Sequence, residues 1–237
     1  MSRILPILFN TDMVQAILDR RKTVTRRVVK YKYSNTEMKM FTNKYGTRLI
    51  EIQKDIEGET HGKNPDGSTW HKLLPYIEKN PPYKKGDILY VREKWNFAYD
   101  MDDGDKIVEG TGRYIYYADA SMPFSHWVDP DTGEHKDKMP WRPSIHMPKE
   151  AARIWLKVTD VRVERLQDMK LNDFLDEGVV IRPEAYNDPD NAYMQAREQF
   201  RFIWESTIKK SDLARYGWDA SPWVWAIEFE RCGKPEW

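Results

Sequence analysis

The sequence predicts an α+β protein in which strands outnumber helices, and three observations support this class. Residues 153–163 and 223–229 have apolar side chains at every second position, as in strands that press one face against a core. Residues 193–204 have the apolar spacing of an amphipathic helix. Hydrophobic residues make up 40% of the 237 residues and charged residues 32%, which is the composition of a folded globular protein.

The first elements are a strand and a short helix. Residues 4–9 form an apolar run that predicts a strand, and Asn10, Thr11 or Asp12 supplies the N-cap of the helix that follows. The apolar stripe of this helix consists of Met13, Val14, Ile17 and Leu18.

The same spacing rules predict the later elements. Gly86 and Asp87 open a strand over residues 88–92, and residues 113–117 form another. A short helix over residues 172–177 ends at Gly178. In the strand over residues 153–163, the side chains expected in the core are Ile154, Leu156 and Val158, and those expected to face away are Arg153, Trp155 and Lys157. The last strand places four apolar side chains on the core: Trp223, Trp225, Ile227 and Phe229.

Two polar stretches interrupt this pattern. Residues 33–82 contain turn signals at 43–46 and 64–67 with weak strand patterns between them, and residues 98–140 include a second acidic, turn-rich excursion. We therefore predict one domain over residues 1–237 with insertions at these two places.

Charge and composition limit the function classes. The chain has 38 basic and 38 acidic residues, so no overall field attracts nucleic acid or an anionic membrane. Seven of the thirteen residues in 20–32 are basic, which makes this the expected phosphate-binding segment. Its candidate binding residues are Arg21, Arg26 and Arg27, and we expect Arg26 and Arg27 to contribute most. One cysteine, Cys232, and five scattered histidines predict neither a disulfide framework nor a metal site, and we expect no cofactor. Without a signal-peptide pattern or an apolar run of membrane-spanning length, we expect a cytoplasmic protein.

Three motifs together resemble the ASCH family. They are Ile17-Leu18 followed by Arg21-Lys22-Thr23-Val24-Thr25-Arg26-Arg27, then residues 86–93 with the sequence GDILYVRE, then Leu166-Gln167-Asp168 through Glu177-Gly178. The segments 143–148 and 222–225 resemble a subgroup often encoded in phages and prophages. These motifs bracket the whole predicted domain and occur in the order found in the family.

The resemblance implies a PUA-like β-barrel whose relatives bind RNA or modified bases. For small ASCH members it implies an amidohydrolase that removes the acetyl group of N4-acetylcytidine, with a lysine, a threonine three positions later and a distant glutamate as active residues. These positions correspond to Lys22, Thr25 and Glu177. The chain departs from the family in having Arg20 where a glycine is common, and in being much longer than the small hydrolases.

The residue types fit amide hydrolysis, which requires a nucleophile, a base and an acid for the leaving nitrogen. Lys22 serves as a base only if burial or the cationic neighbours Arg21, Arg26 and Arg27 lower its pKa. Residues three apart on a flat strand point to opposite faces, so Lys22 and Thr25 converge only across a turn or twist. The alternative is an exposed basic strand with solvated arginines. Glu177 follows Asp176 at the negative end of a helix, where it is either a general acid or an exposed acid at a frayed end.

A second group of candidate substrate- or nucleic-acid-binding residues lies after the strand over residues 88–92. Arg92, Glu93 and Trp95 are expected either to hold a base by stacking and edge hydrogen bonds or to form a rim ion pair over a core tryptophan. Ser144 and His146 are expected in a pocket-lining or structural loop, because no nucleophile-elbow glycines flank the serine.

Two functions remain open at this point. One is an amidohydrolase that acts on N4-acylated cytidine or a related modified nucleoside. The other is a non-catalytic module that binds RNA, single-stranded or modified nucleic acid, with residues 20–32 on the phosphates and an aromatic pocket for one base. Balanced net charge favours the enzyme, and the long polar insertion favours the binding module.

Overall fold

The structure is a computed structural model, and it confirms an α+β protein with several sheets and few helices. It describes residues 2–34, 36–44, 46–53, 61–63, 65–66, 69–71, 77–100, 102–103, 106–119, 127–129, 132–136 and 139–236. The central sheet has five strands in the order β1 (Ile4–Leu8), β8 (Ile88–Arg92), β13 (Trp155–Arg165), β14 (Trp223–Cys232) and β2 (Val24–Val28).

Strand pairing leaves β1 and β2 as the edges of this sheet. β1 runs parallel to β8, with Ile4 opposite Ile88, and the other neighbours are antiparallel. The longest ladder joins β13 to β14 and shifts register between Val158 and Asp160. Such a bulge increases the local twist of a sheet.

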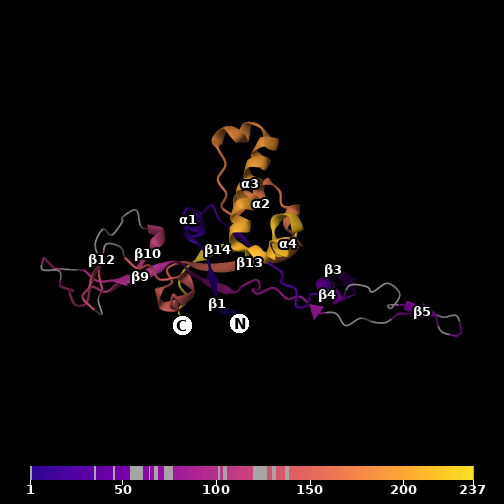
Figure 1. Cartoon of the computed structure of the whole chain (residues 1–237), viewed down its shortest axis with the longest axis horizontal. Helices are drawn as coiled ribbons and strands as arrows, with labels where there is room; N and C mark the ends of the chain where they lie inside the picture. The colour runs from indigo at the N-terminus through magenta and orange to yellow at the C-terminus, as the bar shows by residue number, and fades with distance from the viewer. Residues whose placement is uncertain are drawn as a thin grey trace.

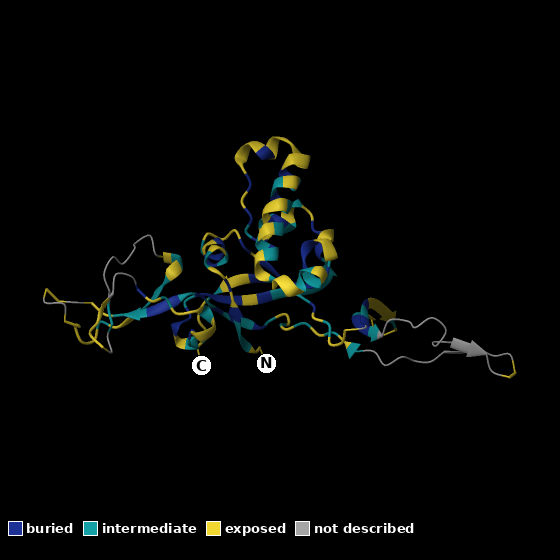
Figure 2. Ribbon diagram, in the orientation of Figure 1, coloured by how far each residue is buried: buried dark blue, intermediate teal, exposed yellow. Residues whose placement is uncertain are grey.

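Both faces of the central sheet are covered, as the dark-blue residues along it in Figure 2 show. One cluster joins apolar side chains of β1, β8, β13 and β14 to α1 (Thr11–Leu18) through Val14 and Ile17. The other face packs against α2 (Leu171–Asp176) and α3 (Pro189–Thr207). These two helices and α4 (Leu213–Tyr216) rise from one side of the sheet in Figure 1. The helices expected near residues 13–18, 172–177 and 193–204 are therefore present.

Coverage of both faces corrects one expectation about β13. Ile154, Leu156 and Val158 are buried as predicted, but Trp155 is 3% exposed instead of facing solvent. Trp155 packs in a third cluster with Trp95 and Met147, because the segment after β9 (Trp95–Ala98) folds back over this end of the sheet. Alternation identified the two faces of the strand, but the second face is covered by chain more distant in sequence.

The two polar stretches form small sheets at opposite ends of the long axis of the molecule (Figure 1). The first contains β3 (Thr36–Asn43), β4 (Gly46–Gln53) and β7 (Ile77–Glu78) in one sheet, and β5 (His61–Lys63) with β6 (Thr69–His71) in another. Of its predicted turn residues, Tyr45, Asn64 and Gly67 lie outside the described residues. The second contains β10 (Arg113–Tyr116), which pairs with β9, and β11 (Trp127–Val128), which pairs with β12 (His135–Lys136).

The first of these sheets is anchored to the main core. Met38 on β3 and Leu49 on β4 belong to the central apolar cluster, and the indole of Trp223 donates a hydrogen bond to the Met38 carbonyl. The carboxylate of Glu51 accepts hydrogen bonds from the backbone amides of Lys32 and Tyr33. The insertion is thus joined by apolar and polar contacts to the central sheet at β14 and to the segment that follows β2.

None of the helices that the structure describes combines the length and the apolar character needed to cross a membrane.

Candidate active site

The end of α1 positions Lys22. The amide of Arg20 donates to the Ile17 carbonyl and the amide of Arg21 donates to the Ala16 carbonyl, which is the Schellman pattern of a helix C-terminus. This pattern needs a left-handed residue after the C-cap, and Arg20 supplies it with φ 62°. The position where the ASCH motif commonly has glycine is therefore one that favours glycine, and the turn forms here with arginine.

The end of α2 positions Glu177 in the same way. Glu177 is the C-cap, Gly178 has φ 94°, and its amide donates to the Leu175 carbonyl. The two helix ends meet, because Arg21 Nη1 donates to the Gly178 carbonyl at 2.7 Å and Lys22 forms an isolated antiparallel bridge with Glu177. The C-terminal ends of α1 and α2, which are far apart in sequence, thus bring Lys22 and Glu177 together.

Lys22 and Glu177 form a buried ion pair. Lys22 Nζ lies 2.5 Å from Glu177 Oε2 and 3.0 Å from the Glu177 carbonyl oxygen, and the side chains are 0% and 4% exposed. Burial lowers the pKa of Lys22, although the Glu177 carboxylate acts in the opposite direction. Lys22 Nζ also lies 5.7 Å from the centre of the Phe9 ring, which leaves it between a carboxylate and an aromatic face.

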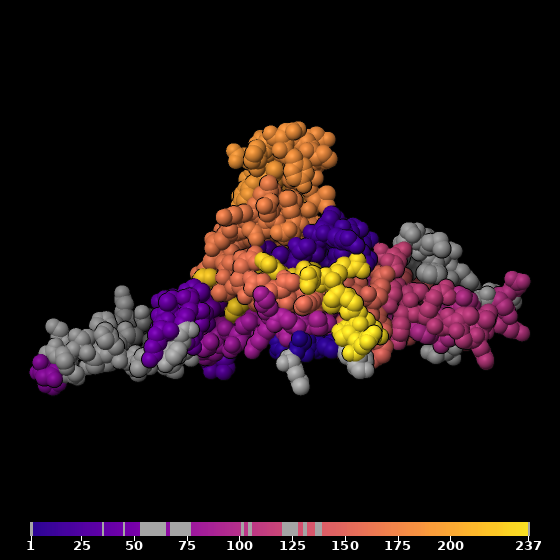
Figure 3. Space-filling model, turned by 180° about the vertical axis from the view of Figure 1, so that it is seen from behind, coloured from indigo at the N-terminus to yellow at the C-terminus, as the bar shows by residue number. Residues whose placement is uncertain are grey.

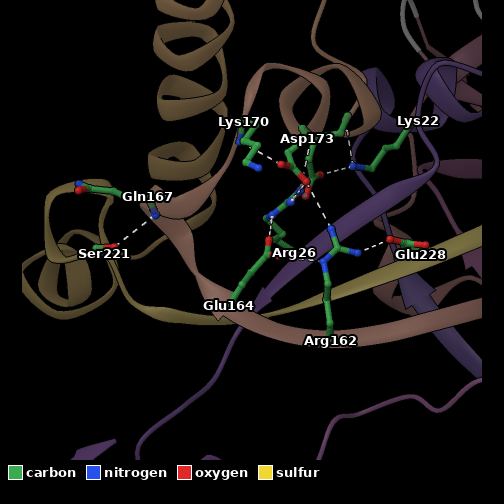
Figure 4. Close-up of polar contacts among 10 residues, drawn as sticks. Lys22, Arg26, Arg162, Glu164, Gln167, Lys170, Asp173, Ser221 and Glu228 are labelled. Carbon is green, nitrogen blue, oxygen red and sulfur yellow. Dashed lines mark hydrogen bonds and ion pairs between the residues drawn. The ribbon is translucent and has the colours of Figure 1, made fainter. Parts of the chain in front are cut away.

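Arg26 extends this pair into a network (Figure 4). Its guanidinium contacts Glu164 at 2.7 Å, Asp173 at 2.7 Å and Glu177 at 3.3 Å, and its side chain has no exposed surface. The expectation of an exposed basic strand is therefore wrong for Lys22 and Arg26, since both are buried. Arg26 also lacks the exposure that a phosphate contact requires. Glu177 likewise is not an exposed acid at a frayed helix end.

Thr25 and Arg27 lie on the other face of β2. Arg27 Nη2 donates to the Leu8 carbonyl at 2.8 Å, and its guanidinium carbon lies 5.3 Å from the centre of the Phe9 ring. Thr25 lies opposite Ile227 and is 1% exposed. Within the described part of the chain no hydrogen bond joins the Thr25 hydroxyl to another residue. The structure thus brings Lys22 and Glu177 into contact and places Thr25 on the face of β2 opposite to Arg26, without a hydrogen bond to either among the described residues.

The second group of predicted residues forms a separate polar cluster. Arg153 makes a two-pronged ion pair with Glu93, with both N–O distances 2.9 Å, and burial raises the pKa of Glu93 against the effect of Arg153. Arg92 Nε donates to the Met147 carbonyl, which fixes the segment that contains Ser144 and His146. The described residues thus show no ion pair between Arg92 and Glu93, because the buried Glu93 pairs with Arg153 and Arg92 binds a backbone carbonyl.

The side chains of this second cluster differ in exposure. Ser144 is partly buried and His146 is exposed. Trp95 is 5% exposed in the core cluster, with the Arg142 guanidinium 5.3 Å from its ring, and its indole nitrogen has no hydrogen-bond partner among the described residues.

Sequence reasoning missed the carboxylates that hold Arg26 and the arginine that holds Glu93. Glu164 lies two residues after Arg162 on β13, so both lie on the face that alternation assigned to solvent. The available signal for a buried polar contact was the pair of charged residues, Arg162 and Glu164, that alternates with apolar core residues. Nothing in the local sequence indicated that α2 covers this face of β13. Asp173 and Arg153 gave no comparable signal.

Comparisons with protein-family models, with curated proteins and with solved structures found no match to this chain. Within the residues that the structure describes, no group of three or more His, Cys, Asp or Glu side chains is placed to hold a metal ion.

Proposed function

We propose that the chain is an ASCH-type amidohydrolase that acts on N4-acylated cytidine or a related modified nucleoside. Thr25 is the nucleophile, Lys22 the base and Glu177 the acid. The observation that carries the proposal is the buried contact of 2.5 Å between Lys22 and Glu177, residues that the motif resemblance paired across 155 positions of sequence. A lysine with a lowered pKa beside a carboxyl group supplies a base and an acid in one place.

A PUA-like barrel is part of this proposal. The Arg27 guanidinium on edge strand β2 donates to the backbone of edge strand β1 at Leu8, so the two edges of the curved sheet approach within the length of one side chain. Tyr83 donates to the Pro6 carbonyl of the same edge. Contacts of this kind support a sheet that closes through side chains instead of a backbone ladder.

The buried pair suits the proposed chemistry because transfer of one proton interconverts two forms. The ion pair becomes a neutral lysine amine and a glutamic acid, and a low-dielectric interior disfavours the separated charges. Thr25 Oγ1 attacks the acyl carbon, its proton passes to the Lys22 amine, and Glu177 protonates N4 as the C–N bond breaks. Water then attacks the acyl-threonine ester, its proton passes to Glu177, and Lys22 returns a proton to Thr25. A carboxylic acid and cytidine are released.

The test is release of cytidine from N4-acetylcytidine by purified protein, followed by a panel of other N4-acyl cytidines. Thr25→Val keeps the volume of the side chain but removes its hydroxyl, so kcat should fall by several orders of magnitude while the thermal unfolding temperature is retained. Thr25→Ser should keep part of the activity. A Thr25→Val variant as active as the wild type would refute the nucleophile assignment.

A second candidate, the non-catalytic nucleic-acid-binding module, is favoured by one observation. Lys22, Thr25 and Glu177 are each almost fully buried, and Arg26 neutralises the same carboxylate, as a purely structural network would do. If the wild type is inactive on the whole panel but binds single-stranded RNA or nucleosides, this second function replaces the first.

A further inference from the structure

A cleft of about 570 Å³ lies next to the candidate site, between the end of α1 and the end of β14. Figure 3 shows these indigo and yellow segments side by side on one face of the molecule. The cleft exists because β14 continues past Glu228, its last residue paired with β2, to Cys232. Beyond that point the chain before β2 turns away toward α1. The volume is within the range of small-molecule sites.

Two arginines line this cleft without a carboxylate partner. Arg20 lies at its α1 side and Arg231 at its β14 side, both are exposed, and neither forms an ion pair with any residue that the structure describes. The one acidic side chain in the lining is Glu230, which lies 3.9 Å from Lys157. The lining is therefore cationic, although the chain as a whole is neutral.

The backbone of Arg20 adds a second argument. A non-glycine residue with φ 62° costs about 1 kcal/mol relative to glycine, and the side chain at this position lines the cleft. Strained backbone of this kind is concentrated at functional sites.

The cleft also adjoins the candidate site from outside. Lys22 is part of its lining although its side chain is buried, and Phe229 in the lining packs against Phe9 at 6.2 Å between ring centres. The Phe9 ring in turn faces Lys22 Nζ. One aromatic layer thus separates the cationic cleft from the buried pair.

From these observations we infer that the cleft binds the phosphate of the substrate through Arg20 and Arg231, so that the natural substrate is a nucleotide or a nucleotide unit of a nucleic acid. Recognition of the cytosine base in this inference rests on the proposed function, whereas binding of the phosphate does not depend on it. It moves the expected phosphate contacts within the basic segment from the buried Arg26 to the exposed Arg20. Guanidinium groups suit phosphate because they donate two parallel hydrogen bonds to its oxygens.

The experiment compares the affinities of the full chain for two matched pairs of small molecules and one oligonucleotide by calorimetric or NMR titration. The pairs are cytidine 5′-monophosphate against cytidine, and ribose 5-phosphate against ribose; the oligonucleotide is a short single-stranded oligocytidylate without terminal phosphates. The wild type should bind each phosphorylated small molecule about tenfold or more tightly than its unphosphorylated partner. A preference for the oligonucleotide over the monophosphate identifies a phosphodiester as the source, and the reverse identifies a mononucleotide.

Arg20→Gly and Arg231→Gln should each reduce the phosphate preference several-fold while leaving affinity for cytidine unchanged. Arg20→Gly relieves backbone strain, so loss of binding in this variant does not result from unfolding. Lys30→Gln removes an exposed charge of the same basic segment outside the cleft and should leave the preference unchanged.

Equal affinity for the phosphorylated and unphosphorylated partners, or a preference that survives both arginine substitutions, overturns the inference. Failure of the proposed function is distinguishable. Arginine-dependent binding of ribose 5-phosphate without any hydrolysis of acyl cytidines rejects the hydrolase and keeps the phosphate site. Hydrolysis of N4-acetylcytidine without phosphate preference does the opposite.

Discussion

Gly178 packs directly against Ala16, so that a Cβ atom added at Gly178 would lie 2.8 Å from the Ala16 Cβ and 3.2 Å from the Lys22 Cβ. This contact joins the ends of α1 and α2, and it sets how close the Glu177 carboxylate lies to the Lys22 amine. The residue that ends α2 therefore also determines the geometry of the candidate site.

Gly178→Ala should destabilise the protein by about 2 kcal/mol or more, because it combines a left-handed backbone with a methyl group that has no space. Any hydrolase activity should fall as well, since Glu177 is displaced from Lys22. Chemical denaturation measures the free energy of unfolding. The control is Gly110→Ala, which has φ 79° and nothing within 4 Å, and should cost only about 1 kcal/mol. Equal losses in the two variants would show that the contact with Ala16 is unimportant.

Arg20→Gly should raise the free energy of unfolding by up to about 1 kcal/mol, because glycine adopts φ near 62° without steric cost. Arg20→Ala is the matched variant, since it also removes the guanidinium but keeps the Cβ atom. Alanine should give no comparable gain. Urea titration of the three proteins measures the difference, and a gain of the same size for alanine would mean that charge repulsion is responsible.

Glu51 should make the stability depend on acid pH. Burial tends to raise the pKa of its carboxyl group, but hydrogen bonds from Lys79, Thr36 and the backbone of residues 32 and 33 outweigh this and lower it from 4.5 to about 2. Because the folded-state pKa is the lower one, the carboxylate stabilises the fold above pH 4.5, and this contribution disappears as the pH falls toward about 2. The shift corresponds to a stabilisation of about 3 kcal/mol.

The measurement is the free energy of unfolding as a function of pH for the wild type and Glu51→Gln. The variant should be less stable at neutral pH by about this amount, and the two curves should converge as the pH approaches 2. Glu37→Gln, on the same small sheet and partly exposed beside Lys39, should retain the wild-type curve. Parallel curves for Glu51→Gln and the wild type would contradict the assignment.

Substitutions in the Lys22–Glu177 pair should affect the free energy of unfolding differently from the turnover of the substrate. Lys22→Met leaves a buried carboxylate with Arg26 as its remaining partner and should destabilise the protein by about 3 kcal/mol. The double variant Lys22→Met/Glu177→Gln removes both charges and should recover part of this loss. Turnover should not recover, because neither the base nor the acid is present. Recovery of activity in the double variant would show that the pair serves only the fold.

Glu177→Gln alone should remove one limb of the pH–rate profile for N4-acetylcytidine, since the amide cannot donate the proton that the leaving nitrogen requires. The limb that remains should lie below the pH range of an ordinary lysine, because burial lowers the pKa of Lys22. A profile with both limbs intact would assign the acid to another residue.

Local sequence determined four strands of the central sheet, β1, β8, β13 and β14, and the end of α2 at the candidate site. Alternating apolar residues identified β13 and β14, and Gly178 marked the end of α2. Both signals are local, because the side-chain period of a strand and the end of a helix depend on the backbone geometry of a few neighbouring residues. Lys22 and Glu177 were paired only through the motif resemblance, since spacing alone put Lys22 and Thr25 on opposite faces of a strand.

The tertiary structure decided which charged side chains are buried. Arg26 looked like a solvated or phosphate-binding arginine, yet it contacts Glu164, which is 138 residues away, and Asp173 on α2. The left-handed turn at Arg20 forms through the local hydrogen bonds that end α1, whereas the contact of the Arg21 side chain with Gly178 depends on the tertiary structure. The physical reason is that periodicity depends on neighbouring residues, whereas desolvation and charge pairing depend on which distant segments the sheet topology brings together.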